Sequence, residues 1–128
     1  MSKIKGKDTQ LEEEGWALLR ESGIRFRKHL KGIPGKPDAA NKRKRLAIFI
    51  DSEFWHGFEW KKRKKDFKSN KKFWIPKIER NIARDREVNR VLKAAGWTVI
   101  RLWERDLHAK QRDRTIRKLQ KIWKSLYK

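Results

Sequence analysis

Two aspartates at expected strand ends are the first candidates for chemistry in this chain of 128 residues. Asp38 follows the turn at 35–37, and Asp51 directly follows the apolar run Leu46–Ile50. Carboxylates at adjacent strand ends can share a divalent cation. Aspartate also favours turns and strand ends for its own sake. The pair, separated by one hairpin-length connection, therefore predicts a metal site better than either residue alone.

A third carboxylate, Asp85, stands in an unusual place on the helix expected over Phe73–Ala95. At about 100° per residue, it falls within the apolar stripe of that helix, which consists of Trp74, Ile78, Ile82 and Leu92. A carboxylate on a core-facing stripe is costly unless it is hydrogen-bonded, paired or bound to a metal. The alternative is an ordinary ion pair with a neighbouring arginine.

Glu12 and His56 are candidates with strong alternative interpretations. The spacing from Thr9 to Glu12 is that of a capping box, in which the glutamate serves only as a helix cap. His56 follows the buried strand, where a neutral imidazole can accept a proton from water. A lone histidine among aromatic residues is more often simply packed. Considered by themselves, Glu12 and His56 are compatible with both a catalytic and a purely structural role.

Two aromatic doublets, Phe54-Trp55 and Phe73-Trp74, flank a run of five cations. That run consists of Lys61, Lys62, Arg63, Lys64 and Lys65. The rings can pack in a core while the cations stay solvated. The same pattern also suits a site in which rings open a base step while cations hold phosphates.

Composition favours a polyanionic partner. Lys and Arg total 37 against 16 Asp and Glu, and the net charge is +21. Nucleic acid is the expected partner because neutralised phosphates release counterions. An anionic membrane surface is the alternative, and only the last helix offers an amphipathic face for it. No apolar run is long enough to span a bilayer, and no signal peptide is apparent, so we expect a cytoplasmic, nucleoid-associated protein without membrane contact.

The residue types available restrict the metal. The chain has no cysteine, which excludes disulfides and thiolate ligands. Its histidines, at positions 29, 56 and 108, lack zinc-like spacing. We therefore expect a hard cation held by oxygen, such as Mg²⁺.

The elements that must position these residues follow from hydrophobic patterning within one domain, 1–128. We expect a basic arm over 1–8, a helix from Thr9 to Ser22, strands over Ile24–Leu30, Asp38–Asn41 and Leu46–Ile50, a long loop over Ser52–Asn70, a helix over Phe73–Ala95, a strand over Trp97–Trp103, and a basic helix over Arg112–Tyr127 within the C-terminal region 108–128. This order indicates a mixed α/β fold.

Taken together, these positions resemble the very short patch repair (Vsr-type) endonucleases, which nick DNA beside a T:G mismatch. The matching stretches extend from Met1 to about Leu107 and include Pro34-Gly35-Lys36-Pro37-Asp38, Phe54-Trp55-His56-Gly57, Arg84-Asp85-Arg86, Ala95-Gly96-Trp97 and Trp103-Glu104. The resemblance implies a restriction-endonuclease-like fold, with a mixed sheet flanked by helices, in a single domain.

The resemblance also implies metal ligands. The catalytic set of the family, written E-D-x-H-D, falls on Glu12, Asp38, His56 and Asp85. Asp38 would bind Mg²⁺ directly, beside the backbone carbonyl of Ile50, and Glu12 would contact the ion through a water molecule.

The remaining catalytic roles concern proton transfer. His56 would act as general base toward the attacking water, with Asp85 orienting its ring. Asp51 matches a position near the metals that is histidine in some relatives and aspartate in others.

The resemblance also implies DNA contacts, and the chain departs from the family pattern at one metal site. Phe54, Trp55 and Trp74 match rings that intercalate next to the mismatch, and Met1 and Ile4 match an arm that inserts from the minor groove, although the arm here is short. Relatives carry a structural zinc held by Cys and His. The matching positions here are Glu53, Phe58, Trp60 and Arg105, so we expect no structural zinc.

The leading hypothesis is therefore a Mg²⁺-dependent endonuclease that nicks double-stranded DNA beside a mismatch. A sequence-directed homing or restriction-type endonuclease would use the same core on a different substrate. A basic DNA-binding module without catalysis is the competing class, and a complete set of acids and a base is more than binding requires.

Overall fold

The computed structural model describes residues 2–53, 55–66 and 71–127, with the backbone alone for residues 2–8, 66, 71 and 109. The DNA contacts expected at Met1 and Phe54, and at the side chain of Ile4, lie outside the described residues.

Strand β3 (Leu46–Asp51) is the centre of the sheet, and all six of its residues are buried. β1 (Arg27–Lys28) and β2 (Ala39–Asn41) precede it in an antiparallel arrangement, and β4 (Thr98–Trp103) pairs with it in parallel. The sheet order is β1-β2-β3-β4. A mixed four-stranded sheet with helices around it confirms the predicted α/β fold class.

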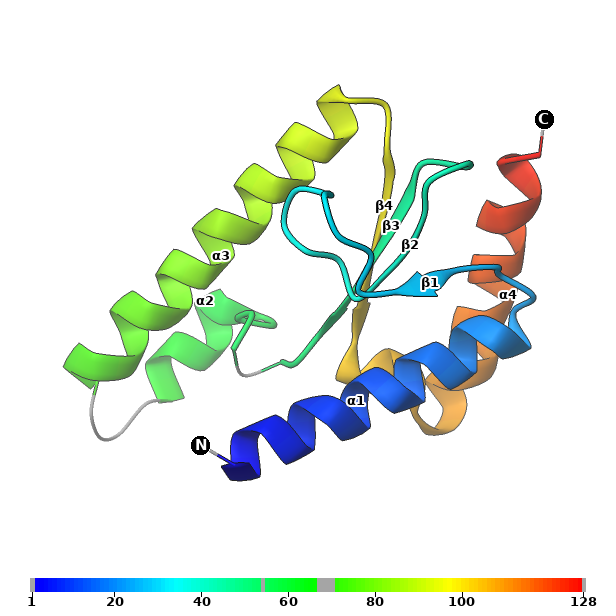
Figure 1. The fold of residues 1–128 in the computed structure, drawn as a ribbon. Coiled ribbons are helices and arrows are strands. Elements are labelled where there is room, and N and C mark those ends of the chain that lie inside the picture. The colour runs from blue at the N-terminus through cyan, green and yellow to red at the C-terminus, as the bar shows by residue number, and fades with distance from the viewer. Residues whose placement is uncertain (1, 54, 67–70, 128) are drawn as a thin grey trace.

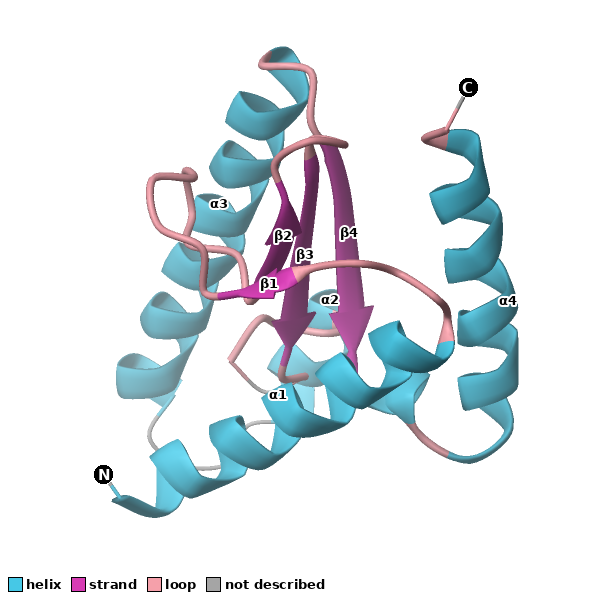
Figure 2. Ribbon diagram, turned by 45° about the vertical axis from the view of Figure 1, so that its right-hand side comes forward, coloured by secondary structure: helices cyan, strands magenta, loops and turns pink. Residues whose placement is uncertain are grey.

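The helices cover both faces of this sheet. α3 (Lys71–Ala94) lies on one side and α4 (Ala109–Ser125) on the other (Figure 1). α1 (Ser2–Glu21) crosses near the carboxyl ends of β3 and β4 (Figure 2). None of these helices, within the described part of the chain, has an apolar stretch long enough to traverse a bilayer.

The alternation of side chains along β3 divides the core into two clusters. Leu46, Ile48 and Ile50 pack with residues of α1 and α4. Ala47 and Phe49 face the other way and pack with Leu92 of α3. The strand is thus buried on both faces, as a continuous apolar run predicts.

Several predicted boundaries were wrong. The arm over 1–8 is not separate, because residues 2–8 form the first turns of α1. These residues include no proline, and the single Gly6 costs only about 1 kcal/mol of helix stability, so the helix extends past the expected capping box at Thr9.

Two further predictions were wrong, because one strand is shorter than expected and one expected loop contains helical turns. The strand expected over Ile24–Leu30 is only Arg27–Lys28, because His29 adopts a left-handed backbone conformation, with φ of 47°, that ends the extended segment. The loop expected over Ser52–Asn70 contains the short helix α2 (Trp60–Arg63) and a 3-10 turn over Lys64–Asp66.

Candidate active site

One cavity of about 780 Å³ lies at the carboxyl end of β3. It collects side chains from α1, the loop before β2, β3, the segment after β3, and α3. The predicted site residues that line it are Glu12, Asp38, Ile50, Asp51, Trp55, His56 and Asp85. The structure therefore brings all the predicted acids and the predicted imidazole to one place.

Strand periodicity and two close approaches explain this convergence. Asp51 is two residues beyond Phe49 and so points to the α3 face of the sheet. Gly35 and Gly57 both have positive φ, at 80° and 68°, and a Cβ at either would lie 2.3–2.4 Å from a side chain of α3. Only glycine lets the segments that carry Asp38 and His56 pack this closely against that helix.

The outer acidic group consists of Glu12, His29 and Asp38, whose ligand atoms all lie within 4.8 Å of one another. The His29 imidazole is 3.0 Å from the Glu12 carboxylate and is 56% exposed. Oδ2 of Asp38 accepts a hydrogen bond of 2.6 Å from the Ile50 N–H. Asp38 is thus fixed to β3, while His29 is exposed and the side chain of Glu12 is 21% exposed.

Burial raises the pKa of Asp38 from 3.8 to about 6, although the Ile50 N–H lowers it, and the nearby Glu12 carboxyl raises it further. Two carboxyls held together in a partly buried site repel each other when both are ionised. A divalent cation would offset this repulsion, and carboxylate oxygens are the ligands that Mg²⁺ prefers. Asp38 and Glu12 therefore fit a hard divalent ion.

The inner acidic group consists of Asp51, His56 and Asp85, whose ligand atoms also lie within 4.8 Å of one another. Nδ1 of His56 is 2.6 Å from the Asp85 carboxylate and 3.7 Å from that of Asp51. The Asp51 side chain is only 3% exposed. An imidazole between two carboxylates has its Nδ1–H committed to Asp85, which leaves Nε2 as the proton acceptor.

The charges of this group act on one another. Burial lowers the pKa of His56, but the hydrogen bond to Asp85 and the charge of Asp51 outweigh it, so that the pKa is raised above 6.5. Burial raises the pKa of Asp51, while the charges of His56 and Arg101 oppose that rise. An imidazole whose protonated form is stabilised by two carboxylates is suited to take up a proton from water, as a general base does.

Sequence reasoning missed two residues of the site. Arg101 of β4 contacts both Asp51 and Asp85. A lone cation in the apolar strand 98–103 is the same kind of anomaly as Asp85 on its helix, so a signal for it was present. His29 had no such signal, because a histidine in a basic stretch expected to form an edge-like strand is unremarkable in sequence.

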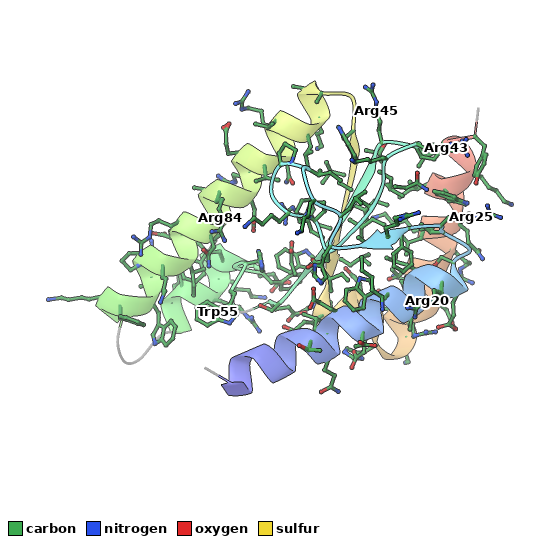
Figure 3. The ribbon with its side chains drawn as sticks, viewed as in Figure 1. Arg20, Arg25, Arg43, Arg45, Trp55 and Arg84 are labelled. Carbon is green, nitrogen blue, oxygen red and sulfur yellow. The ribbon has the colours of Figure 1, made fainter. Side chains whose placement is uncertain are left out.

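Aromatic rings cluster near the α3 side of the site, and Trp55 is the member of this cluster that lines the cavity. Trp55 and Trp74 pack edge to face with centroids 5.5 Å apart, and Phe73 packs on Trp74 at 4.8 Å. The Asn81 side chain donates to the Trp55 carbonyl at 3.0 Å. Figure 3 shows Trp55 and Arg84 toward α3, whereas Arg20, Arg25 and Arg43 lie toward α4.

The predicted phosphate-binding run, Lys61–Lys65, is not a loop. It lies on α2 and the following 3-10 turn, and all five residues are exposed. Lys64 forms an ion pair of 2.9 Å with Glu79, and Arg63 lies 3.9 Å from Glu53. Part of the run therefore has partners within the protein, and its contact with DNA stays a prediction.

The positions that match the zinc ligands of relatives contact one another in a different way. Arg105 forms an ion pair of 2.9 Å with Glu53, and its guanidinium carbon is 3.8 Å from the centroid of the Phe58 ring. Phe58 also packs edge to face on Trp103 at 5.0 Å. In this chain, an ion pair and an edge-to-face ring contact connect the segment after β3 to the end of β4.

The mixed sheet, the helices on both its faces and the acids at the carboxyl end of β3 define a restriction-endonuclease-like protein. Comparison with known families is more specific. The profile of the family described as DNA mismatch endonuclease Vsr matches residues 1–62.

Individual relatives extend this match over most of the chain. The Type II nicking enzyme V.NmeDIP of Neisseria meningitidis serogroup C is 51% identical over 92 residues, which cover 72% of this chain and 60% of the relative. The Type II nicking enzyme V.HpaIIP of Haemophilus parainfluenzae is 52% identical over 92 residues, covering 72% and 62%. DNA mismatch endonuclease Vsr of Escherichia coli (strain K12) is 32% identical over 112 residues, covering 88% and 71%.

The chain belongs to the DNA mismatch endonuclease Vsr family. The resemblance found in the sequence is thereby confirmed. The chain spans about three fifths of the length of the two nicking enzymes.

Proposed function

We propose that this protein is a DNA endonuclease that hydrolyses one phosphodiester bond with the help of Mg²⁺. The observation that carries the proposal is the convergence of the His56–Asp85 pair and the Asp38–Glu12 pair on a single cavity. One pair provides a base and the other provides oxygen ligands for a cation. Each of them accelerates the hydrolysis of a phosphodiester.

His56 removes a proton from the attacking water through Nε2. Asp85 accepts the hydrogen bond of Nδ1–H, holds the ring in one tautomer and stabilises the positive charge that develops when the ring takes up the proton. Asp51, at 3.7 Å, adds to that stabilisation. Proton transfer to a positioned base of this kind contributes about 10²–10⁴-fold to a rate.

Asp38 and Glu12 are the residues that would hold Mg²⁺, with the Ile50 carbonyl proposed as a further ligand. When bound, the ion supplies positive charge that neutralises the scissile phosphate and stabilises the leaving oxygen. The hydrogen bond from the Ile50 N–H fixes Asp38, so the carboxylate is oriented before the substrate arrives.

The substrate we propose is double-stranded DNA, nicked next to a T:G mismatch. The net charge of +21 supports binding to phosphates. The half-buried Trp55 beside the cavity, backed by Trp74, supports insertion of a ring at an unstable base step. The relatives described as Type II nicking enzymes favour a single-strand cut and keep a sequence-directed substrate as the second candidate.

Cleavage mapping on end-labelled duplexes tests this function. Each strand is labelled in turn, and a T:G duplex is compared with its matched T:A and C:G counterparts, with Mg²⁺ or with a chelator. We expect one strand of the T:G duplex to be cut, only with Mg²⁺. Equal cutting of a matched duplex at one sequence would support the sequence-directed alternative.

Matched variants separate this activity from a contaminating nuclease. His56→Ala and Asp38→Ala should abolish cutting, whereas His108→Ala, which removes an exposed histidine paired with Glu14, should not. Binding to duplex without cleavage by the unaltered protein under every condition would favour a DNA-binding module and reject the proposal.

Trp55→Ala tests the mismatch preference separately. The substitution should lower cleavage of the T:G duplex more than it lowers affinity for a matched duplex, because the ring acts at the mismatch and the cations act on phosphates everywhere. An equal loss on both duplexes would reject insertion of the ring.

A further inference from the structure

Arg101 occupies the centre of the inner acidic group. Its Nη1 lies 2.9 Å from Oδ2 of Asp51 and 3.6 Å from Oδ1 of Asp85. Its Nε donates to the side-chain oxygen of Asn89 at 2.8 Å. The guanidinium carbon stands 4.1 Å from the centroid of the Phe49 ring. Two elements of the fold, β3 and α3, thus hold this one cation of β4, and only 16% of its side chain is exposed.

Strand register explains how the arginine reaches this place. β3 and β4 run in parallel with Phe49 paired to Arg101, so the two side chains lie on the same face of the sheet. Asp51 is the next residue of β3 on that face, and Asp85 approaches from α3. Arg101 is therefore fixed between the two carboxylates that flank His56.

We propose that Arg101 is a positioning residue that acts as the built-in cation of the inner acidic group: it holds Asp51 and Asp85 around His56 and excludes a divalent ion from them. The ion then belongs to the outer acidic group, and His56 stays available as a base instead of becoming a ligand. The role of Arg101 in positioning His56 rests on the proposed function, whereas the exclusion of a divalent ion by Arg101 does not.

Charge balance supports this division. Without Arg101, two carboxylates and an imidazole within 4.8 Å of one another would form an N,O,O set suited to a divalent ion. With Arg101 in place, its guanidinium supplies the positive charge that the ion would otherwise supply, through a buried, charge-assisted pair. The outer acidic group differs, because among the described residues the exposed imidazole of His29, and no arginine or lysine, forms an ion-pair contact with its carboxylates.

The groups that face His56 come from several elements. Asp51 of β3 and Asp85 of α3 favour its protonated form, and Arg101 of β4 opposes protonation. Glu12 and Asp38 line the same cavity, as do the cations Lys36 and Arg84. Of these cations, Arg101 is the one that contacts both carboxylates of the inner acidic group.

Mn²⁺ binding, followed by electron paramagnetic resonance and by calorimetry on the full chain, tests the exclusion of metal. Asp38→Asn should abolish binding to the free protein, and Asp51→Asn should change the dissociation constant by less than about threefold. Arg101→Leu should add one Mn²⁺ site to the wild-type number. Arg84→Leu is the matched control, since Arg84 lines the same cavity without bridging the two acids, and should add none.

The opposite pattern would overturn the proposal. Loss of a wild-type Mn²⁺ site in Asp51→Asn would show that the inner acidic group binds metal despite Arg101. An unchanged number of sites in folded Arg101→Leu would show that the arginine excludes nothing. If Arg101→Leu does not fold, the comparison of Asp38→Asn with Asp51→Asn still decides, because it needs no change at Arg101.

The titration of His56 tests the positioning role. In the metal-free protein, Arg101→Leu leaves His56 beside two uncompensated carboxylates, so the midpoint of its imidazole titration, followed by nuclear magnetic resonance with a chelator present, should move to higher pH by roughly one unit. Arg101→Lys keeps the charge and should restore much of the wild-type midpoint, and Arg84→Leu should leave the midpoint in place. An unchanged midpoint in folded Arg101→Leu would mean a merely structural role and would reject the proposal.

Discussion

The outer and inner acidic groups contain the same chemistry, two carboxylates and one imidazole, yet their surroundings differ. In the outer group the imidazole of His29 is 56% exposed and lies against Glu12. In the inner group His56 is 24% exposed and lies between two acids that also contact Arg101. Identical donor sets therefore acquire different roles from burial and from the nearest fixed charge.

This comparison supports the proposal that the outer group binds the metal and that the inner group transfers the proton. Within the described part of the chain, Asp38 forms no ion pair with an arginine or a lysine, and its pKa rises to about 6. Asp51 is more deeply buried and is neutralised by a guanidinium at 2.9 Å. Variants that affect one group without the other can sharpen or break this assignment.

The largest effect is expected from Asp38→Asn. Asparagine keeps the size of the side chain but removes the charge that a divalent ion needs, so nicking should fall by about 10³-fold or more. Stabilisation of the fold by Mg²⁺, measured as the shift of the thermal midpoint with added ion, should disappear with it. A variant that kept this Mg²⁺-dependent shift would contradict the assignment of the metal to the outer group.

A smaller effect is expected from Asp85→Asn, which acts only on the inner group. The amide cannot hold the imidazole as an anion does, so His56 loses its fixed tautomer and nicking should fall by about 10–100-fold. The affinity for Mn²⁺, measured by calorimetry, should remain at the wild-type value. A parallel loss of metal affinity would mean that the two groups are not separate.

The pH dependence of metal binding should distinguish the groups further. Because the pKa of Asp38 is raised to about 6 in the free protein, a proton competes with the ion below that pH. The affinity for Mg²⁺ should therefore fall as pH drops through about 6, by roughly tenfold per unit, and stay level above it. Isothermal titrations with Mg²⁺ at several pH values between about 5 and 8 would measure this dependence. An affinity that is constant down to pH 5 would be incompatible with Asp38 as the ligand.

The smallest effect is expected from His29→Ala. The pair of His29 with Glu12 is exposed, and exposed ion pairs contribute only about 0.2–1 kcal/mol. Metal affinity should change by about fivefold or less, in contrast to the loss expected at Asp38. A loss as large as that of Asp38→Asn would make His29 an essential ligand and would change the composition of the outer group.

Some features followed from local sequence alone. The continuous apolar run 46–50 specified a strand buried on both faces, because such a run has no polar side to expose. Asp85 on an apolar helix stripe indicated a partner, and the structure supplies His56 at 2.6 Å. Order and spacing of short motifs indicated the family, and the comparisons confirm it.

Other features depended on how the elements meet. Glu12 had a full explanation as a helix cap, but α1 extends beyond Thr9, and Glu12 instead lines the cavity beside His29 and Asp38. The segment after β3 read as a loop because its helix α2 spans only Trp60–Arg63, too short for a periodic pattern to emerge.

The sequence by itself determined which residues carry charge and reactivity, where the buried strand runs, and to which family the chain belongs. Only the tertiary structure decided that the four predicted acids and the predicted imidazole share one cavity, that His29 joins the outer acidic group, and that Arg101 neutralises the acids of the inner one. The physical reason is that these interactions connect residues up to 50 positions apart. These distances are fixed by the strand register, by the positive φ of Gly35 and Gly57, and by the packing of α3. No local sequence pattern specifies which residues these features bring together.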